Sequence, residues 1–234
     1  MRIFVAGASG VVGRPLLHLL VSDGHEVNGT TRSASKQADI RALGATAVVV
    51  DAFDRAALVA AAVAARPEVV IHQLTDLPDV LDPTVMPAAL AANSRLRIEG
   101  TANLVAAAKA AGARRLIAQS IAFVYVAGTP PYRESDPIEP TADGVISLEN
   151  AVLGGGGIEG IVLRYGRFYG PGTWTDAPAG PGSIHAEAAA EAARLAVTRG
   201  APGIYNIAED DGAVDISKAR RDLGFDPGFR LGGV

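Results

Sequence analysis

The sequence has no cysteine, few lysines and no long hydrophobic run. Its 234 residues contain four histidines, and its only lysines are Lys36, Lys109 and Lys218. The absence of cysteine excludes disulfides and thiolate catalysis. The most apolar runs, residues 45–50 and 56–65, are far shorter than the roughly 20 residues that a membrane-spanning helix needs. No secretion-signal pattern precedes the first strand-like segment. We therefore expect a cytoplasmic protein without a membrane span.

The charge of the chain is close to balanced. The formal net charge is -4, and no block of like charges stands out. Such a chain has no general attraction for nucleic acid or anionic lipid, so we expect neither as a partner. Hydrophobic residues make up 49% of the chain, which is enough for a substantial core in one large domain or one domain with a small appendage.

Short Val- and Ile-rich runs alternate with alanine-rich segments of helical period. This pattern is typical of β-α units around a parallel sheet, with seven strands and helices on both faces. The long segment 86–111 ends at Gly112, a natural helix C-terminal glycine, and is predicted to be the longest helix. The predicted strands are 2–6, 26–30, 47–50, 69–72, 115–118, 160–164 and 203–206, and the predicted helices are 12–22, 36–43, 55–64, 86–111, 147–153, 185–198 and 216–223.

A glycine-rich segment, GASGVVG, joins the first strand to the first helix at residues 7–13. Glycines at these positions permit a tight turn, a close approach of backbone to pyrophosphate, and close packing of helix on strand. The free N-H groups of the helix N-terminus then face the phosphates. We predict a Rossmann-type α/β fold that binds a nicotinamide dinucleotide at Gly7, Ser9, Gly10, Val11, Val12 and Gly13. A purely structural glycine turn is the alternative.

The residues after the second and third strands bear on the choice of cofactor. Thr31 and Arg32 follow the second strand, where a carboxylate would bind the ribose of NAD and a cation would bind the 2′-phosphate of NADP. Arg32 therefore favours NADP, with NAD possible, unless Arg32 is an ordinary surface charge. Asp51, followed by Ala52, ends the third strand and is expected either to meet the adenine ring or to cap the next helix.

Several longer segments carry a family resemblance. They are the glycine turn, Asp51, VVIHQL at 69–74, Asn93 with EGTANL at 99–104, AQSIAFVY at 118–125, LRYGRFYGPG at 163–172 and SKARRDLGF at 217–225. With these segments the chain resembles the extended short-chain dehydrogenase/reductase superfamily, in particular its NAD-dependent epimerase/dehydratase group. The resemblance implies further cofactor contacts from Asp51, Ala52, Gln73, Leu74, Asn93, Ser120 and Tyr165.

The same resemblance implies a domain plan and an assembly. It predicts a doubly wound sheet in a dinucleotide-binding domain at 1–172 and a reduced C-terminal substrate lobe at 173–234, because only about a dozen residues stand where the family has a larger insertion. His185 and Glu187 match a family strand and are read mainly as a structural link to the last helices. It also implies a homodimer through the long helix, although the alanines of that helix could equally pack within one chain.

The chain departs from the family at the acid/base residues. The family uses a Tyr with a Lys four residues later, and none of the five tyrosines here has such a lysine. With Glu149 on the family's glutamate, Thr141 and Val145 fall where Tyr and Lys belong. We therefore name Ser120 and Tyr125 as candidate catalytic residues, with His72 as a further proton carrier. Ser120 could instead satisfy backbone at a strand end, and the two rings could be packed side chains.

Two functions follow from these features. One is an NAD(P)-dependent oxidoreductase, or an epimerase or dehydratase, that acts on a small carbonyl or sugar-like substrate with non-standard acid/base residues. Loops rich in Tyr, Arg and Trp174 favour such a small-molecule pocket. The other is a catalytically inactive NADP(H)-binding sensor or regulatory protein, which the missing Tyr-Lys pair favours.

Overall fold

A seven-stranded parallel sheet forms the centre of the molecule. The computed structural model describes residues 1–232. The strands are β1 (Arg2–Ala6), β2 (Glu26–Thr31), β3 (Thr46–Val49), β4 (Val69–His72), β5 (Arg115–Ile121), β6 (Glu159–Tyr165) and β9 (Gly203–Ile207). Their order across the sheet is β3-β2-β1-β4-β5-β6-β9, and the strand order reverses between β1 and β4, where such sheets bind ligands. The predicted Rossmann-type α/β fold is confirmed.

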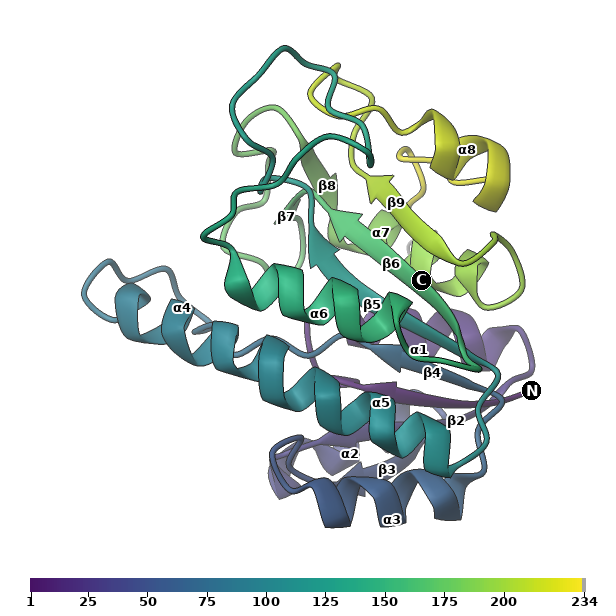
Figure 1. Ribbon diagram of the computed structural model, residues 1–234. Coiled ribbons are helices and arrows are strands. Elements are labelled where there is room, and N and C mark those ends of the chain that lie inside the picture. The colour runs from purple at the N-terminus through teal and green to yellow at the C-terminus, as the bar shows by residue number, and fades with distance from the viewer. Residues whose placement is uncertain (233–234) are drawn as a thin grey trace.

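Helices cover both faces of this sheet (Figure 1). The first hydrophobic core packs α1 (Gly13–Ser22), α2 (Gln37–Ala42), α7 (Ala186–Ala196) and α8 (Ser217–Leu223) on one face. The second core packs α3 (Arg55–Ala65), α5 (Thr101–Ala110) and α6 (Asp143–Leu153) on the other. Because the central strands β1, β4, β5 and β6 contribute buried apolar side chains to both cores, both faces must be covered. Among residues 1–232, no helix has the length and apolarity to span a membrane.

The predicted helix at 86–111 is a composite. It consists of α4 (Met86–Arg95), a π-helical turn at Leu96–Gly100 and α5, and it ends at Gly112, whose φ of +70° suits the expected glycine stop. α4 extends beyond the edge of the sheet (Figure 1). The prediction of one regular α-helix was therefore wrong at the π turn, because alanine periodicity does not reveal a single wide turn.

Two further differences concern α6 and the C-terminal part. α6 begins at Asp143, four residues before the predicted start, and contains Gly144, which normally disfavours helix. A Cβ at Gly144 would lie 2.7 Å from Ser94 Oγ, so close packing on the long helix requires this glycine. β7 (Arg167–Tyr169) and β8 (Ser183–His185) pair in a separate two-stranded sheet that the period of the sequence did not predict.

Candidate cofactor and catalytic site

The glycine turn between β1 and α1 has a shape that side chains would disrupt. Gly7 has a φ of +87°, and a Cβ there would lie 2.5 Å from the carbonyl oxygen of Gln73. A Cβ at Gly13 would overlap the carbonyl oxygen of Gly7, and the Gly10 amide donates to that same oxygen at 3.1 Å. The three glycines therefore hold the turn against both the helix and the end of β4.

The N-terminus of α1 has backbone amides that are free to donate hydrogen bonds. Among residues 1–232, no oxygen accepts a hydrogen bond from the amides of Val11 or Val12, and no side chain caps the helix. Free amides at a helix N-terminus attract phosphate through hydrogen bonds and through the helix dipole. The turn therefore fits the pyrophosphate of a dinucleotide.

The end of β2 lies beside this turn. Ser9 Oγ donates to Thr31 Oγ1 at 3.3 Å, which brings two predicted cofactor residues together. Arg32 is 67% exposed and donates to Asp76 Oδ1 at 2.8 Å. The amide of Asp76 in turn donates to the buried Asn93 Oδ1 at 2.9 Å. Arg32 is thus not an isolated surface charge: a carboxylate already holds it, and a 2′-phosphate would compete with that carboxylate.

Asp51 does not cap the following helix, so that alternative was wrong. Its Oδ1 accepts from the amide of Phe53 at 2.9 Å, whereas Asp54 caps α3 by accepting from the amide of Ala57 at 3.0 Å. Asn103 Nδ2 donates to the carbonyl oxygen of Ala52 at 3.0 Å and holds this loop against α5. Asp51 is exposed at the same edge of the sheet as Thr31.

Gln73 and Tyr165 lie together behind the turn. Gln73 Nε2 donates to Tyr165 Oη at 3.3 Å, and Tyr165 is fully buried, so burial raises the pKa of its phenol. Gln73 Oε1 is buried and has no partner among the described residues. A buried acceptor without a donor is costly. Gln73, whose backbone carbonyl lies against Gly7, thus carries an unpaired acceptor, which is a second feature that fits a bound ligand.

His72 is held as a neutral ring. Its Nδ1 accepts from the amide of Leu74 at 3.1 Å, so its Nε2 carries the hydrogen and donates to Thr101 Oγ1 at 2.9 Å. Burial, and secondly the Arg97 cation, lower the pKa of His72 to about 4. Both ring nitrogens are occupied by protein groups, so His72 has no free position for substrate.

The buried His72 should make stability depend on pH. Below pH 6.5 an unfolded histidine takes up a proton, whereas folded His72 does so only near pH 4. The free energy of unfolding should therefore fall by about 3 kcal/mol as the pH drops from 6.5 to 4, with no further loss from this group below pH 4. Urea denaturation across this range should show the loss in wild type and in His18→Gln, which changes an exposed histidine. The His72→Gln variant should show a flatter profile, and an equal slope would contradict the prediction.

A buried ion pair joins β5, β6 and α6. Arg164 binds Glu149 through two hydrogen bonds, Nε to Oε1 at 2.9 Å and Nη2 to Oε2 at 2.7 Å. The two side chains are 4% and 6% exposed. Ser120 Oγ donates to the same Glu149 Oε1 at 2.7 Å. The hydroxyl hydrogen of Ser120 is therefore committed to a carboxylate.

Tyr125 extends this network toward β9. Its hydroxyl donates to Asn206 Oδ1 at 2.6 Å and accepts from Arg164 Nη1 at 3.0 Å. Its ring stacks on Tyr132 with centroids 5.3 Å apart. Burial raises the pKa of the Tyr125 phenol, against the opposing effect of Arg164. Ser120 and Tyr125 thus lie in one network, and their catalytic roles stay predictions.

The positions where the family has Tyr and Lys carry no proton chemistry. Thr141 is exposed just before α6, and Val145 is buried within α6. Arg164 and Asn206 were not among the predicted site residues. The alternation of side chains along β6 could have identified Arg164. Arg164 lies two positions after buried Val162, on the same face of the strand, and a buried arginine requires a partner.

Hydrogen bonds tie the start of α7 to the last described residues and the loop after β7 to the loop after β4. His185 Nδ1 accepts from the amide of Glu187 at 3.3 Å and caps α7, while Glu187 Oε2 accepts from the amide of Leu231 at 2.9 Å. These contacts agree with the expected role of His185 and Glu187 as a structural link to the C-terminal part of the chain. Trp174 Nε1 donates to the carbonyl oxygen of Pro78 at 3.0 Å and ties the loop after β7 to the loop after β4.

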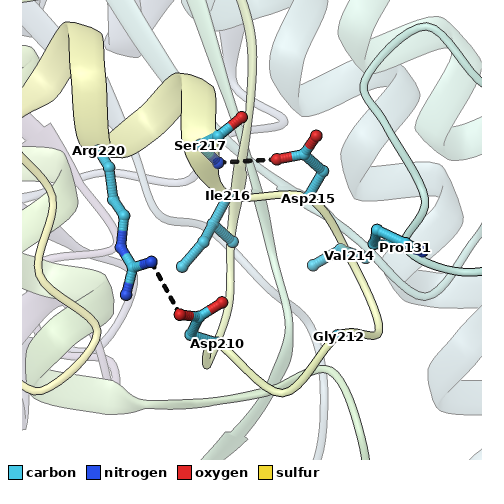
Figure 2. A pocket seen from close by; sticks show the side chains of 8 residues that line it. All are labelled: Pro131, Asp210, Gly212, Val214, Asp215, Ile216, Ser217 and Arg220. Atoms are coloured by element: carbon cyan, nitrogen blue, oxygen red, sulfur yellow. Dashed lines mark hydrogen bonds and ion pairs between the residues drawn. The ribbon is translucent and has the colours of Figure 1, made fainter.

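Two surface hollows lie next to the Tyr125 and Asn206 end of this network: Asp215, whose carbonyl accepts from Asn206, lines one, and Tyr132, which stacks on Tyr125, lines the other. Figure 2 shows one of about 270 Å³, where Arg220 pairs with Asp210 at 2.8 Å and Asp215 accepts from the amide of Ser217 at 2.9 Å. The other, of about 250 Å³, lies along residues 126–137. Neither hollow is lined by the glycine turn or by the ion pair of Glu149 and Arg164. We place the candidate site at the carboxyl ends of β1, β4, β5 and β6, because the glycine turn and the ion pair lie there.

Comparisons with known proteins agree with this geometry. A family model described as NAD(P)H-binding matches residues 7–169. A 3-diazoavenalumate denitrifying reductase from a Streptomyces species is 48% identical over 183 residues, covering 74% of this chain and 58% of that protein. The chain thus matches somewhat more than half the length of this relative.

Solved structures share the fold at low sequence identity. UDP-glucose 4-epimerase from Thermotoga maritima superposes with a TM-score of 0.80 at 18% identity, covering 98% of this chain and 94% of the epimerase. A double mutant of dTDP-glucose 4,6-dehydratase from Streptomyces venezuelae gives a TM-score of 0.79 at 17% identity, covering 98% and 92% of the two chains.

Proposed function

Because the chain belongs to the NAD(P)H-binding family, with the fold of the epimerase/dehydratase group, we propose that it is an NAD(P)H-dependent reductase of a small molecule. The observation that carries the proposal is the glycine turn: its uncapped amides and its lack of room for a Cβ suit a dinucleotide pyrophosphate. The reductase relative at 48% identity supports reduction as the direction of the reaction.

The reaction we propose requires little proton transfer by side chains of the protein. A bound reduced nicotinamide supplies hydride, and the protein binds the cofactor, orients the substrate and excludes water. Ser120 gives its hydrogen to Glu149, and Tyr125 gives its hydrogen to Asn206. We therefore expect an activated electrophile as substrate. The relative is named for the reduction and denitrification of a diazo compound, and we include such compounds among the candidates.

Binding of both coenzymes and turnover with NADPH test the proposal. Purified protein is titrated with NADPH and NADH by calorimetry, then mixed with NADPH and a panel of aldehydes, ketones, nucleotide sugars and diazo carboxylates while nicotinamide absorbance is followed. A substrate-dependent fall in absorbance supports the reductase. Binding without turnover across the panel would instead favour a sensor, which the occupied hydrogens of Ser120 and Tyr125 also suit. Absence of heat with either coenzyme at millimolar concentration contradicts both functions.

We propose NADP(H) as the preferred cofactor, with Arg32 as its 2′-phosphate ligand. Arg32→Ala should weaken NADPH binding on the order of tenfold and leave NADH binding unchanged, because only NADPH carries the extra phosphate. Asp76→Asn should strengthen NADPH binding, since it removes the carboxylate that competes for Arg32. Arg41→Ala, an exposed arginine on α2 that donates to Gln37, is the control. Equal losses for the two coenzymes in Arg32→Ala would rule out this role.

We further propose a cytoplasmic homodimer that pairs through α5 and α6. Ala107 and Ala108 of α5 are buried within the single chain, so the dimer would use the remaining outer positions of that helix. Sedimentation equilibrium measures the mass directly.

A further inference from the structure

Arg97 is a partly buried cation that makes no ion pair within the described part of the chain. It lies in the π-helical turn Leu96–Gly100, between α4 and α5. Among residues 1–232, no oxygen accepts a hydrogen bond from its guanidinium, and the one charged group that acts on it is Glu149. Partial burial lowers the pKa of Arg97, yet none of its nitrogens is among the fully buried atoms without a partner in residues 1–232, so they face open space.

The neighbours of Arg97 along the helix show where its side chain lies. Ser94, three residues earlier, contacts α6 so closely that a Cβ at Gly144 would come within 2.7 Å of its Oγ. Thr101, four residues later, is bonded through Oγ1 to His72 Nε2 at 2.9 Å. Residues at such spacing share one helix face. Arg97 is therefore directed between the end of β4 and α6, toward the Ser120 edge of the sheet.

The groups around Arg97 leave its charge uncompensated. Glu149 carries one negative charge, but Arg164 binds both of its oxygens and Ser120 donates to one of them. His72 is neutral above pH 4. Arg97, Arg164, Glu149 and neutral His72 together carry one net positive charge. A guanidinium binds a planar carboxylate through two parallel hydrogen bonds, and Arg97 has its donors available for that geometry.

We propose that Arg97 binds a carboxylate of the substrate and holds the substrate beside Ser120 at the end of β5. The inference rests on the proposed reductase function and names its substrate class, a small-molecule carboxylate. The ion pair of Glu149 and Arg164 acts as the fixed wall of this site, and Arg97 provides the charge that the incoming carboxylate neutralises.

Carboxylate binding can be measured without knowing the substrate. Wild-type protein, saturated with NADP, is titrated calorimetrically with benzoate, with benzamide as the neutral comparison and inorganic phosphate as the second anion. Benzoate should bind with a Kd of about 1–10 mM. Arg97→Met should weaken benzoate binding at least about tenfold, and Arg97→Lys should give an intermediate loss because it keeps the charge without the planar fork. NADP affinity should stay within about twofold. Arg220→Met, an arginine beyond β9, is the control.

The outcomes separate this inference from the proposed function. Failure of NADP to bind contradicts the reductase, so the benzoate titration is repeated on free protein, where Arg97→Met should still bind more weakly. Benzoate binding that is absent in wild type, unchanged in Arg97→Met, matched by benzamide or exceeded by phosphate overturns the carboxylate assignment.

The titration of His72 gives a second readout that a loss of folding would not imitate. Removal of the Arg97 cation should raise the pKa of His72, because that cation contributes to its low value. Ring chemical shifts measured by NMR in Arg97→Met and in wild type report this change in folded protein. An unchanged His72 titration overturns the placement of Arg97 at this edge.

Discussion

Glu149→Gln is expected to lower the free energy of unfolding by about 3–5 kcal/mol, because it leaves Arg164 buried without its counter-charge. Glutamine keeps the volume and one acceptor oxygen, so the loss reports charge and not a cavity. Arg164 is 4% exposed and donates two of its hydrogen bonds to Glu149. Urea denaturation followed by circular dichroism measures the change.

Two further variants sharpen the measurement on Glu149. Glu99→Gln removes a carboxylate that pairs with Arg95 at the surface and should leave the denaturation midpoint unchanged. The double variant Glu149→Gln with Arg164→Met should recover part of the loss, since no charge is then stranded. A loss below about 1 kcal/mol in Glu149→Gln would show that water reaches Arg164 and that the network is not sealed.

Gly13→Ala is expected to abolish NADP(H) binding, with a loss of more than a hundredfold in affinity. A Cβ at position 13 would overlap the carbonyl oxygen of Gly7 and lie 2.7 Å from that of Ala8. The start of α1 must then move away from the turn, and the amides of Val11 and Val12 move with it. Calorimetry with NADPH measures the loss, and the melting temperature reports the accompanying strain.

Gly10→Ala tests the same turn with less strain. Its Cβ would lie 3.3 Å from the carbonyl oxygen of Gly7, a contact that small shifts relieve, so the protein should remain folded. The added methyl group would still stand where pyrophosphate approaches the backbone, and we expect at least about tenfold weaker binding. Gly128→Ala, where a Cβ makes ordinary contact with Tyr132 at 3.5 Å, is the control. Unchanged NADPH binding in both Gly10→Ala and Gly13→Ala would remove the turn from the cofactor site.

The sequence alone predicted the scaffold well. The seven strands of the central sheet, the glycine turn and the stop at Gly112 all follow from local signals: apolar runs of strand length, glycines at fixed offsets and helical period. The start of α6 and the π turn were not predicted. Gly144 is required by close packing of α6 on the long helix, and neither feature has a signal in its own local sequence.

The candidate site was predicted only in part, because its contacts join distant parts of the chain. Ser120 and Glu149 are 29 positions apart, and Tyr125 and Asn206 are 81 apart. Arg32 reaches Asp76 across 44 positions, so the sequence identified the cation but not the carboxylate that holds it. Arg97 belongs to no motif, and its proposed role rests on the absence of a partner among residues 1–232, which is visible only in the folded chain.

Local chemistry therefore determined the fold class and the cofactor turn, since both depend on residues that are neighbours along the chain. The tertiary structure decided which polar groups are satisfied and which charge is left over. Sheet register aligns Ser120 with Arg164 and Arg164 with Asn206, and the packing of α6 adds Glu149. The register and the packing result from burial of the two hydrophobic layers as a whole, and no single segment encodes them.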